Sequence, residues 1–209
     1  MILYRIGRAI LRFFCRINHS LTAKGVENIP TSGRAIIACN HRCASDPIYH
    51  ACSIRQKLYF IAKKELFSFK PLGALLRALG AFPVDRAAID RNAMRNAVEL
   101  LEQDKMLLIF PEGTRSRDGT LGVFKNGAAS FALQAGAPIV PAAIIMPHGK
   151  GFFKPVRIIY GEPITIEELR AAGGGNGESE SLAKTTRAAT ALIRERISSL
   201  IEQGYDLWK

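Results

Sequence analysis

The alternation of strand-like and helix-like segments constrains the fold of this chain more than any other feature of its sequence. Short runs rich in Ile and Val alternate with segments whose apolar residues recur at helical spacing. Strands are expected at 33–39, 57–62, 81–85, 105–110, 137–145 and 155–164, and helices at 47–56, 72–80, 92–103 and 127–134. This alternation predicts an α/β fold, in which a mostly parallel, mixed sheet is flanked by helices and ligands bind at the carboxyl ends of the strands.

Length and composition indicate one folded domain. The 209 residues, 48% of them hydrophobic, are enough for one sizeable core, and no repeat or low-complexity block interrupts them. A glycine-rich loop at 171–181 precedes a last expected helix that runs to about Gln203. We therefore divide the chain into an amphipathic helix at 1–22 and a folded domain at 23–209.

The N-terminal segment 1–22 has the pattern of an amphipathic helix. Its apolar residues recur at helical spacing, and its four arginines line the opposite side: Arg5, Arg8, Arg12 and Arg16. A helix that spans a bilayer needs about 20 mostly uncharged residues, so these arginines argue against a transmembrane helix. The pattern predicts a helix that lies on an anionic membrane surface. Packing of the same helix on the domain's own core, with the arginines in water, remains open.

The charge of the chain favours an anionic partner. Lysine and arginine outnumber aspartate and glutamate by 29 to 18, which gives a net charge of +11. A nucleic-acid-binding module would interleave aromatic and basic residues on one surface, whereas most aromatic residues here fall within apolar periods, so we expect no nucleic-acid partner. The four cysteines lie in or beside apolar stretches, and no secretory signal is visible, which indicates a reducing compartment.

The segment "ACNHRCASDP" at 38–47 carries the first candidate site. The strand at 33–39 delivers His41 to its carboxyl end, and Asp46 followed by Pro47 is typical of a helix start with aspartate as N-cap. A turn that ends at Asp46 lets the carboxylate fold back onto the imidazole. A carboxylate on one ring nitrogen fixes the tautomer, so the other nitrogen is free to accept a proton. The segment therefore predicts His41 as a general base and Asp46 as its orienting group.

Three alternatives for this segment remain open. A zinc site could draw on two histidines and three cysteines, although none of them forms a C-x2-C pair: Cys39, His41, Cys43, His50 and Cys52. Cys43 could act as a thiol nucleophile with His41 as its base. The histidine and aspartate could also be merely structural, as in a lipid-surface protein without catalytic activity.

Basic residues at other strand ends predict an anion pocket beside the His–Asp pair. After the strand at 105–110 comes "PEGTRSRDG", in which Gly113 lets the backbone approach a ligand and Arg115 offers a fork of donors. Arg86 follows a second strand, and Lys63 ends a third. Because the carboxyl ends of parallel strands meet at one edge of a sheet, we expect these side chains to converge.

Four segments together resemble the glycerolipid acyltransferases. "NHRCASD" resembles the N-H-x4-D motif of that family, "GAFPVDR" its second block, "FPEGTRS" its third and "IVPAAI" its fourth, in the same order and spacing over residues 24–162. The resemblance implies His41 as general base and Asp46 as its orienter. It also implies a set of residues around the substrate phosphate: Glu112, Gly113, Arg115, Lys63 and Arg86.

Within that family, the motifs most resemble those of the bacterial enzymes that acylate 1-acylglycerol-3-phosphate. The resemblance implies transfer of an acyl chain from acyl-CoA or acyl carrier protein to the 2-hydroxyl of lysophosphatidate, giving phosphatidate, without a metal or cofactor. Glycerol-3-phosphate and a lyso-aminolipid remain rival acceptors. The expected location is the cytoplasmic face of the cell membrane, as a peripheral protein.

Overall fold

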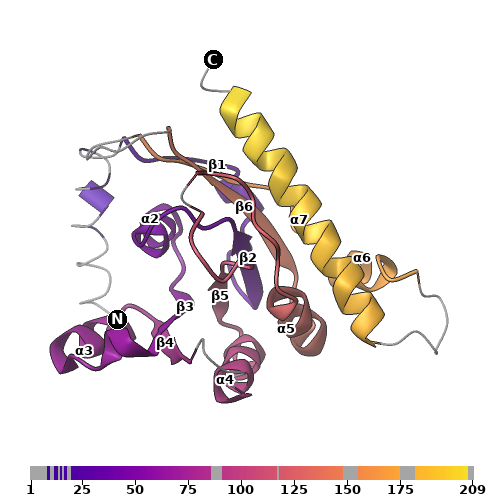
Figure 1. Ribbon diagram of the computed structural model, residues 1–209, viewed down its shortest axis with the longest axis horizontal. Helices are drawn as coiled ribbons and strands as arrows, with labels where there is room; N and C mark the ends of the chain where they lie inside the picture. The colour runs from indigo at the N-terminus through magenta and orange to yellow at the C-terminus, as the bar shows by residue number, and fades with distance from the viewer. Residues whose placement is uncertain are drawn as a thin grey trace.

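The computed structural model describes residues 20–85, 91–116, 118–147, 155–174 and 182–206, together with Ala9, Arg12, Phe13, Cys15 and Ile17. Within these ranges the strands form one seven-stranded sheet in the order β1-β7-β6-β2-β5-β3-β4 (Figure 1). The strands are β1 (Thr22–Lys24), β2 (Ala35–Cys39), β3 (Leu58–Lys63), β4 (Ala81–Val84), β5 (Met106–Ile109), β6 (Ile139–Ile145) and β7 (Arg157–Tyr160).

Helices flank this sheet. They are α2 (Asp46–Ser53), α3 (Lys70–Ala78), α4 (Arg91–Glu102), α5 (Gly127–Ala135), α6 (Ile166–Ala171) and α7 (Leu182–Asp206), with two short 3-10 helices, η1 (Val26–Asn28) and η2 (Lys64–Phe67). One face of the sheet packs on α4, α5 and α7, and the other packs on α2. Because helices cover both faces, the central strands are buried along their whole length and consist of uninterrupted apolar runs.

The predicted α/β fold is confirmed. β2 pairs in parallel with β5 and β6, β3 pairs in parallel with β4 and β5, and β6 pairs antiparallel with β7, so the sheet is mostly parallel and mixed. The strands and helices expected from residue 33 onward all form, with ends that differ by a few residues. As a result, β2, β3 and β5 end at the same edge, where the turn after each strand can reach the others.

Besides the two short 3-10 helices, one strand and one α-helix were not predicted. β1 has three residues, too few for an alternating pattern, and it pairs in parallel with β7. Its start at Thr22 means that the sheet begins at the last residue of the predicted N-terminal helix. α6 begins with a capping box, in which Thr165 and Glu168 bond each other's backbone N–H groups. This Thr-x-x-Glu signal is visible in the sequence and could have located the helix.

The N-terminal helix stays a prediction. Ala9, Arg12, Phe13, Cys15 and Ile17 are helical, with Cys15 buried and Phe13 and Ile17 exposed, but most of 1–19 lies outside the described residues. The division at residues 22 and 23 is likewise a prediction. In the described parts of the chain, no helix has the length and apolar content needed to cross a membrane.

Candidate active site

The turn after β2 brings His41 and Asp46 together, as the sequence predicted. Asp46 Oδ2 lies 2.7 Å from His41 Nδ1. Asp46 is fully buried, and 9% of His41 is exposed. A carboxylate at Nδ1 requires the proton on that nitrogen, so Nε2 keeps the lone pair that can accept another proton. The pair therefore has the arrangement of a base and its orienting group.

Backbone donors hold the Asp46 carboxylate in place. Oδ2 accepts the N–H groups of Arg42 at 2.7 Å and Cys43 at 3.0 Å, and Oδ1 accepts the Cys43 thiol at 3.0 Å. Asp46 is not the N-cap that was predicted: Ser45 is the N-cap, and Asp46 is the first residue of α2. The reason is that its carboxylate bonds back to the turn instead of forward into the helix. These donors compensate the burial of the charge.

The rings of Phe110, His50 and Tyr160 pack beside the turn that carries His41. Phe110, directly after β5, stacks on the His41 ring with 4.1 Å between ring centroids and 17° between planes. His50 on α2 is fully buried, with Nδ1 2.9 Å from the Tyr160 hydroxyl. Burial lowers the pKa of His50 to about 4. His50 is therefore neutral at ordinary pH and adds no competing charge beside Asp46.

Glu112 braces the backbone of His41. Its Oε1 accepts the His41 N–H at 2.8 Å, its Oε2 accepts the Gly122 N–H at 2.9 Å, and the residue is buried. From the same loop, the Ser116 N–H donates to the His41 carbonyl at 2.8 Å. A carboxylate has no donor to offer a phosphate, and both oxygens of this one are engaged. The geometry therefore favours a positioning role for Glu112 over the predicted phosphate contact.

Gly113 occupies a position that suits glycine. Its φ of 69° lies in the left-handed region, and a Cβ added there would come within 3.1 Å of the Lys125 side chain. Lys125, which follows the loop in the sequence, was not predicted as part of the site. The Lys125 ammonium group therefore lies beside the "PEGTR" loop. The signal that could have indicated it is only its basic charge, which the sequence shares with 28 other lysines and arginines.

Three of the predicted residues line a cavity of about 300 Å³. His41, Lys63 and Arg115 are its polar lining, and Phe60, Leu66, Leu76 and Phe110 are among its apolar lining. Lys63 also lies 3.1 Å from Glu65, with about half of its side chain exposed. Arg86 lies outside the described residues. The structure thus brings a base and two cations to one partly apolar pocket at the carboxyl edge of the sheet.

The structure weakens the two alternatives that use cysteine, a thiol nucleophile at Cys43 and a zinc site. Burial, together with the charge of Asp46, raises the pKa of the Cys43 thiol to about 12, so this thiol is a poor nucleophile. Cys39 and Cys52 are buried as free thiols. Among the residues with described positions, no three His, Cys, Asp or Glu side chains gather where they could hold a metal ion.

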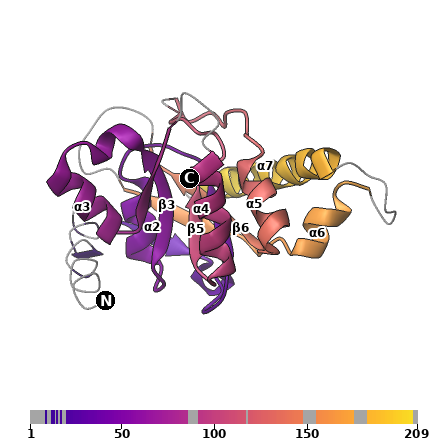
Figure 2. The ribbon, with the colours of Figure 1, turned by 90° about the horizontal axis from the view of Figure 1, so that it is seen from below.

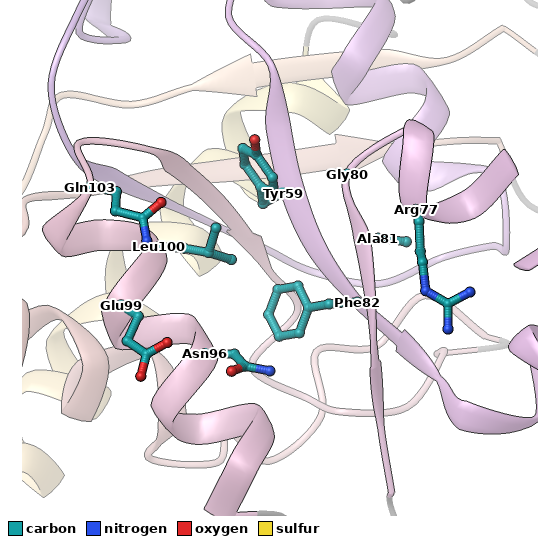
Figure 3. A pocket seen from close by; sticks show the side chains of 9 residues that line it. All are labelled: Tyr59, Arg77, Gly80, Ala81, Phe82, Asn96, Glu99, Leu100 and Gln103. Carbon is teal, nitrogen blue, oxygen red and sulfur yellow. The ribbon is translucent and has the colours of Figure 1, made fainter. Parts of the chain in front are cut away.

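A second cavity, of about 270 Å³, lies between β3, β4, α3 and α4 (Figure 3). Tyr59 and Phe82 form its floor, and Arg77 and Glu99 stand on opposite sides. None of the predicted site residues lines this cavity. Of the predicted site residues, His41, Lys63 and Arg115 line the cavity at His41.

Comparison with known proteins places these residues in a family. A family model described as Acyltransferase matches residues 20–145. A 1-acyl-sn-glycerol-3-phosphate acyltransferase of Bacillus subtilis is 32% identical over 197 residues, which cover 92% of this chain and 96% of that protein. One from Streptococcus pneumoniae is 32% identical over 160 residues, 74% of this chain and 59% of that protein.

The fold has a solved counterpart. The crystal structure of the 1-acyl-sn-glycerophosphate (LPA) acyltransferase, PlsC, from Thermotoga maritima matches this chain with a TM-score of 0.68. The match covers 94% of this chain and 80% of that chain at 24% sequence identity. At this identity the likeness shows a shared fold, consistent with the parallel sheet and its flanking helices.

Proposed function

Since this chain belongs to the acyltransferase family, we propose that it transfers an acyl chain from an acyl thioester to the 2-hydroxyl of 1-acylglycerol-3-phosphate. The product is phosphatidate. The observation that carries the proposal is the buried His41–Asp46 pair, at 2.7 Å, beside a pocket that also holds Lys63 and Arg115. The names of the relatives in Bacillus subtilis and Streptococcus pneumoniae support this choice of acceptor.

His41 acts as the general base. Its Nε2 takes the proton of the acceptor hydroxyl while that oxygen attacks the thioester carbonyl, and a tetrahedral oxyanion forms. When this intermediate collapses, the C–S bond breaks and the imidazolium returns the proton to the departing thiolate. Asp46 stabilises the imidazolium and holds the tautomer, and a positioned base of this kind contributes about 10²–10⁴ in rate. The mechanism uses no metal, cofactor or acyl-enzyme.

The cations hold the acceptor's phosphate. Arg115 can offer two parallel N–H donors and Lys63 a point charge, and both line the pocket that contains His41. Arg86 remains a proposed third cation, and Gly113 lets the loop backbone approach the phosphate. Glu112 acts indirectly, because it fixes the backbone of His41. The apolar lining of the pocket, including Phe60 and Leu76, suits an alkyl chain.

The proposed location is the cytoplasmic face of the cell membrane. The net charge of +11 supports an anionic surface as partner, and the predicted helix at 1–22 supplies arginines for it. Both the acceptor and the product are lipids that reside in a bilayer. Acyl-CoA and acyl carrier protein both remain candidate donors, since each presents the same thioester to the pocket.

One experiment tests the acceptor. Purified protein is given each thioester with lysophosphatidate, glycerol-3-phosphate or a lyso-aminolipid, and the lipid products are identified by mass spectrometry. We expect phosphatidate from lysophosphatidate, with the other two acceptors slower by at least an order of magnitude. A site that pairs a phosphate rejects the lyso-aminolipid, which lacks that group, and glycerol-3-phosphate lacks the acyl chain that the apolar lining of the pocket would hold. Faster acylation of glycerol-3-phosphate would identify the rival activity.

A further inference from the structure

Helix α3 carries apolar residues that the domain does not bury. Of its nine residues, only Gly73 is buried, where the helix backbone passes against Phe67. By contrast, α4 buries Ala93, Ala97 and Leu101 against the sheet. An amphipathic helix ordinarily turns its apolar side to the core. The apolar side of α3 therefore needs another explanation.

The exposed apolar residues of the molecule are concentrated here. Nine large apolar side chains are exposed in the described ranges, and four of them fall between residues 66 and 75: Leu66, Phe69, Leu72 and Leu75. We call these four residues the α3 face. Phe69, Leu72 and Leu75 follow one another at three-residue steps, so they share one side of the helix. Phe69 is 66% exposed and Leu75 is 56% exposed, which is unusual for large apolar residues that share one side of a helix.

Cations lie at the N-terminal border of the α3 face, where Lys63, Lys64 and Lys70 are exposed. Arg77 is turned away from this face, because it lies over the Phe67 ring and lines the second cavity. Two acids offset part of this charge, since Glu65 lies 3.1 Å from Lys63 and Asp85 lies 3.9 Å from Lys64. The balance remains positive. Exposed apolar side chains beside exposed cations are the combination that an anionic lipid surface selects.

We propose that the α3 face binds the surface of an anionic phospholipid bilayer. A second copy of the chain is a poorer occupant, because two-fold pairing would oppose the same cations across the interface. Figures 1 and 2 show α3 at the end of the molecule away from α6 and α7, with its outer side clear of the sheet. The contact therefore belongs to the folded domain and adds to that predicted for the N-terminal segment.

This surface adjoins the active-site pocket. Leu66 of the α3 face lines the cavity at His41, together with Leu76 of the same helix and Lys63 at its border. With the α3 face on the bilayer, a lipid acceptor enters the pocket past η2 without crossing water. This second consequence rests on the proposed function, whereas the binding of lipid by the α3 face does not.

The test uses the double variant Leu72→Gln/Leu75→Gln, whose residues do not line the pocket at His41. Glutamine keeps most of the helix propensity and length of leucine. Leu182→Gln is the matched control, since Leu182 is 65% exposed on α7. Binding to phosphatidylglycerol-containing vesicles is measured by sedimentation. We expect the double variant to bind about tenfold to hundredfold more weakly, as loss of two apolar insertions implies, and the control to bind as wild type does.

Three results would overturn the proposal. The double variant could bind these vesicles within twofold of wild type. It could lower the midpoint of thermal unfolding substantially, which would mean that the α3 face packs on the chain itself. Wild type could also dimerise without lipid while the double variant stays monomeric, which would identify a second copy as the occupant.

Activity is measured separately with a short-chain, monomeric lysophosphatidate. The double variant should turn over this acceptor at the wild-type rate, because the acceptor does not need the bilayer. If neither protein acylates it while their vesicle binding still differs, the proposed function fails and the bilayer contact stands.

Discussion

The turn that carries His41 and the helix α3 lie on two sides of the same pocket, and they are built in opposite ways. In the turn, Asp46 is fully buried and its oxygens accept two backbone N–H groups and a thiol, while Glu112 and Ser116 bond the backbone of His41. In α3, Gly73 is the one buried residue, and Leu72 and Leu75 are exposed. The turn is complete within the chain, whereas these two leucines are not covered by the described residues.

The two regions differ in how firmly the fold holds their side chains before a substrate binds. A base must be within hydrogen-bond reach of its proton, and small displacements are costly, so the groups that react are held by internal bonds. A surface that meets a fluid bilayer needs apolar area and charge but no fixed geometry. Substitutions in the turn should therefore act on kcat, and those in α3 on access to lipid.

Loss of the His41 imidazole should have the largest effect on the transfer rate. His41→Ala should lower the transfer rate by a factor on the order of 10²–10⁴ or more, because no other group in the pocket is placed to take the proton. The rate is followed as thiol release with lysophosphatidate present, and circular dichroism checks that the protein is folded. More than a tenth of the wild-type rate in the folded variant would show that His41 is not the base.

Asp46→Asn separates orientation from basicity. The amide cannot hold the proton on His41 Nδ1 as the carboxylate does, and the loss of an orienting carboxylate can reduce kcat by a factor on the order of 10⁴. The variant should remain folded, with some loss of stability because backbone donors in the turn are left poorly paired. Its kcat is compared with that of wild type in the same assay. A reduction smaller than tenfold would leave Asp46 a structural role only.

Arg115→Ala tests the cation on the other side of the pocket. A charge-assisted hydrogen bond contributes about 1.5–3 kcal/mol, so kcat/KM for lysophosphatidate should fall by about 10–100-fold, mostly through KM. Arg115→Lys should restore only part, since lysine lacks the two-pronged donor. Steady-state kinetics give both parameters. Unchanged kinetics in Arg115→Ala would remove Arg115 from the phosphate site.

Glu112→Gln tests whether Glu112 positions His41 or contacts the phosphate. One of the two backbone donors, at His41 or Gly122, would then face an NH₂ group and lose its acceptor. We expect a loss of stability of about 1–3 kcal/mol and a reduction of kcat of about tenfold, with KM for lysophosphatidate nearly unchanged. Denaturant unfolding and steady-state kinetics measure these effects. A large change in KM at constant kcat would instead support the phosphate contact.

The smallest expected effect concerns His50 and pH. Its folded-state pKa, about 4, lies below the ordinary value of 6.5, so the unfolded chain binds more protons between these values. The stability due to this group is complete above pH 6.5 and is lost as the pH falls toward 4. From about pH 8 to about pH 5 the loss is about 2 kcal/mol. His50→Gln should lack this part of the loss in denaturant unfolding, and equal losses in both proteins would contradict it.

Sequence patterns predicted the long elements and the His–Asp contact because both depend on short-range order. The Ile-rich runs at β2 and β6 allow little besides buried strands, and His41 and Asp46 are only five positions apart in the sequence. The bond of Glu112 to His41 was not predicted, because it joins residues 71 positions apart, which no local pattern records. α3 was predicted as a helix, but its apolar spacing is the same whether those residues face a core or a bilayer.

In the proposed mechanism, His41 acts directly on the acceptor hydroxyl and no acyl-enzyme forms. The most direct measurement mixes the protein, at a concentration comparable to the thioester, with acyl thioester alone and follows thiol release on a rapid time scale. If no acyl-enzyme forms, no rapid release of thiol is expected until lysophosphatidate is added, after which thiol and phosphatidate appear in equal amounts. A rapid release equal to the enzyme concentration without acceptor, lost in His41→Ala or Cys43→Ala, would show a covalent acyl-enzyme and contradict the account.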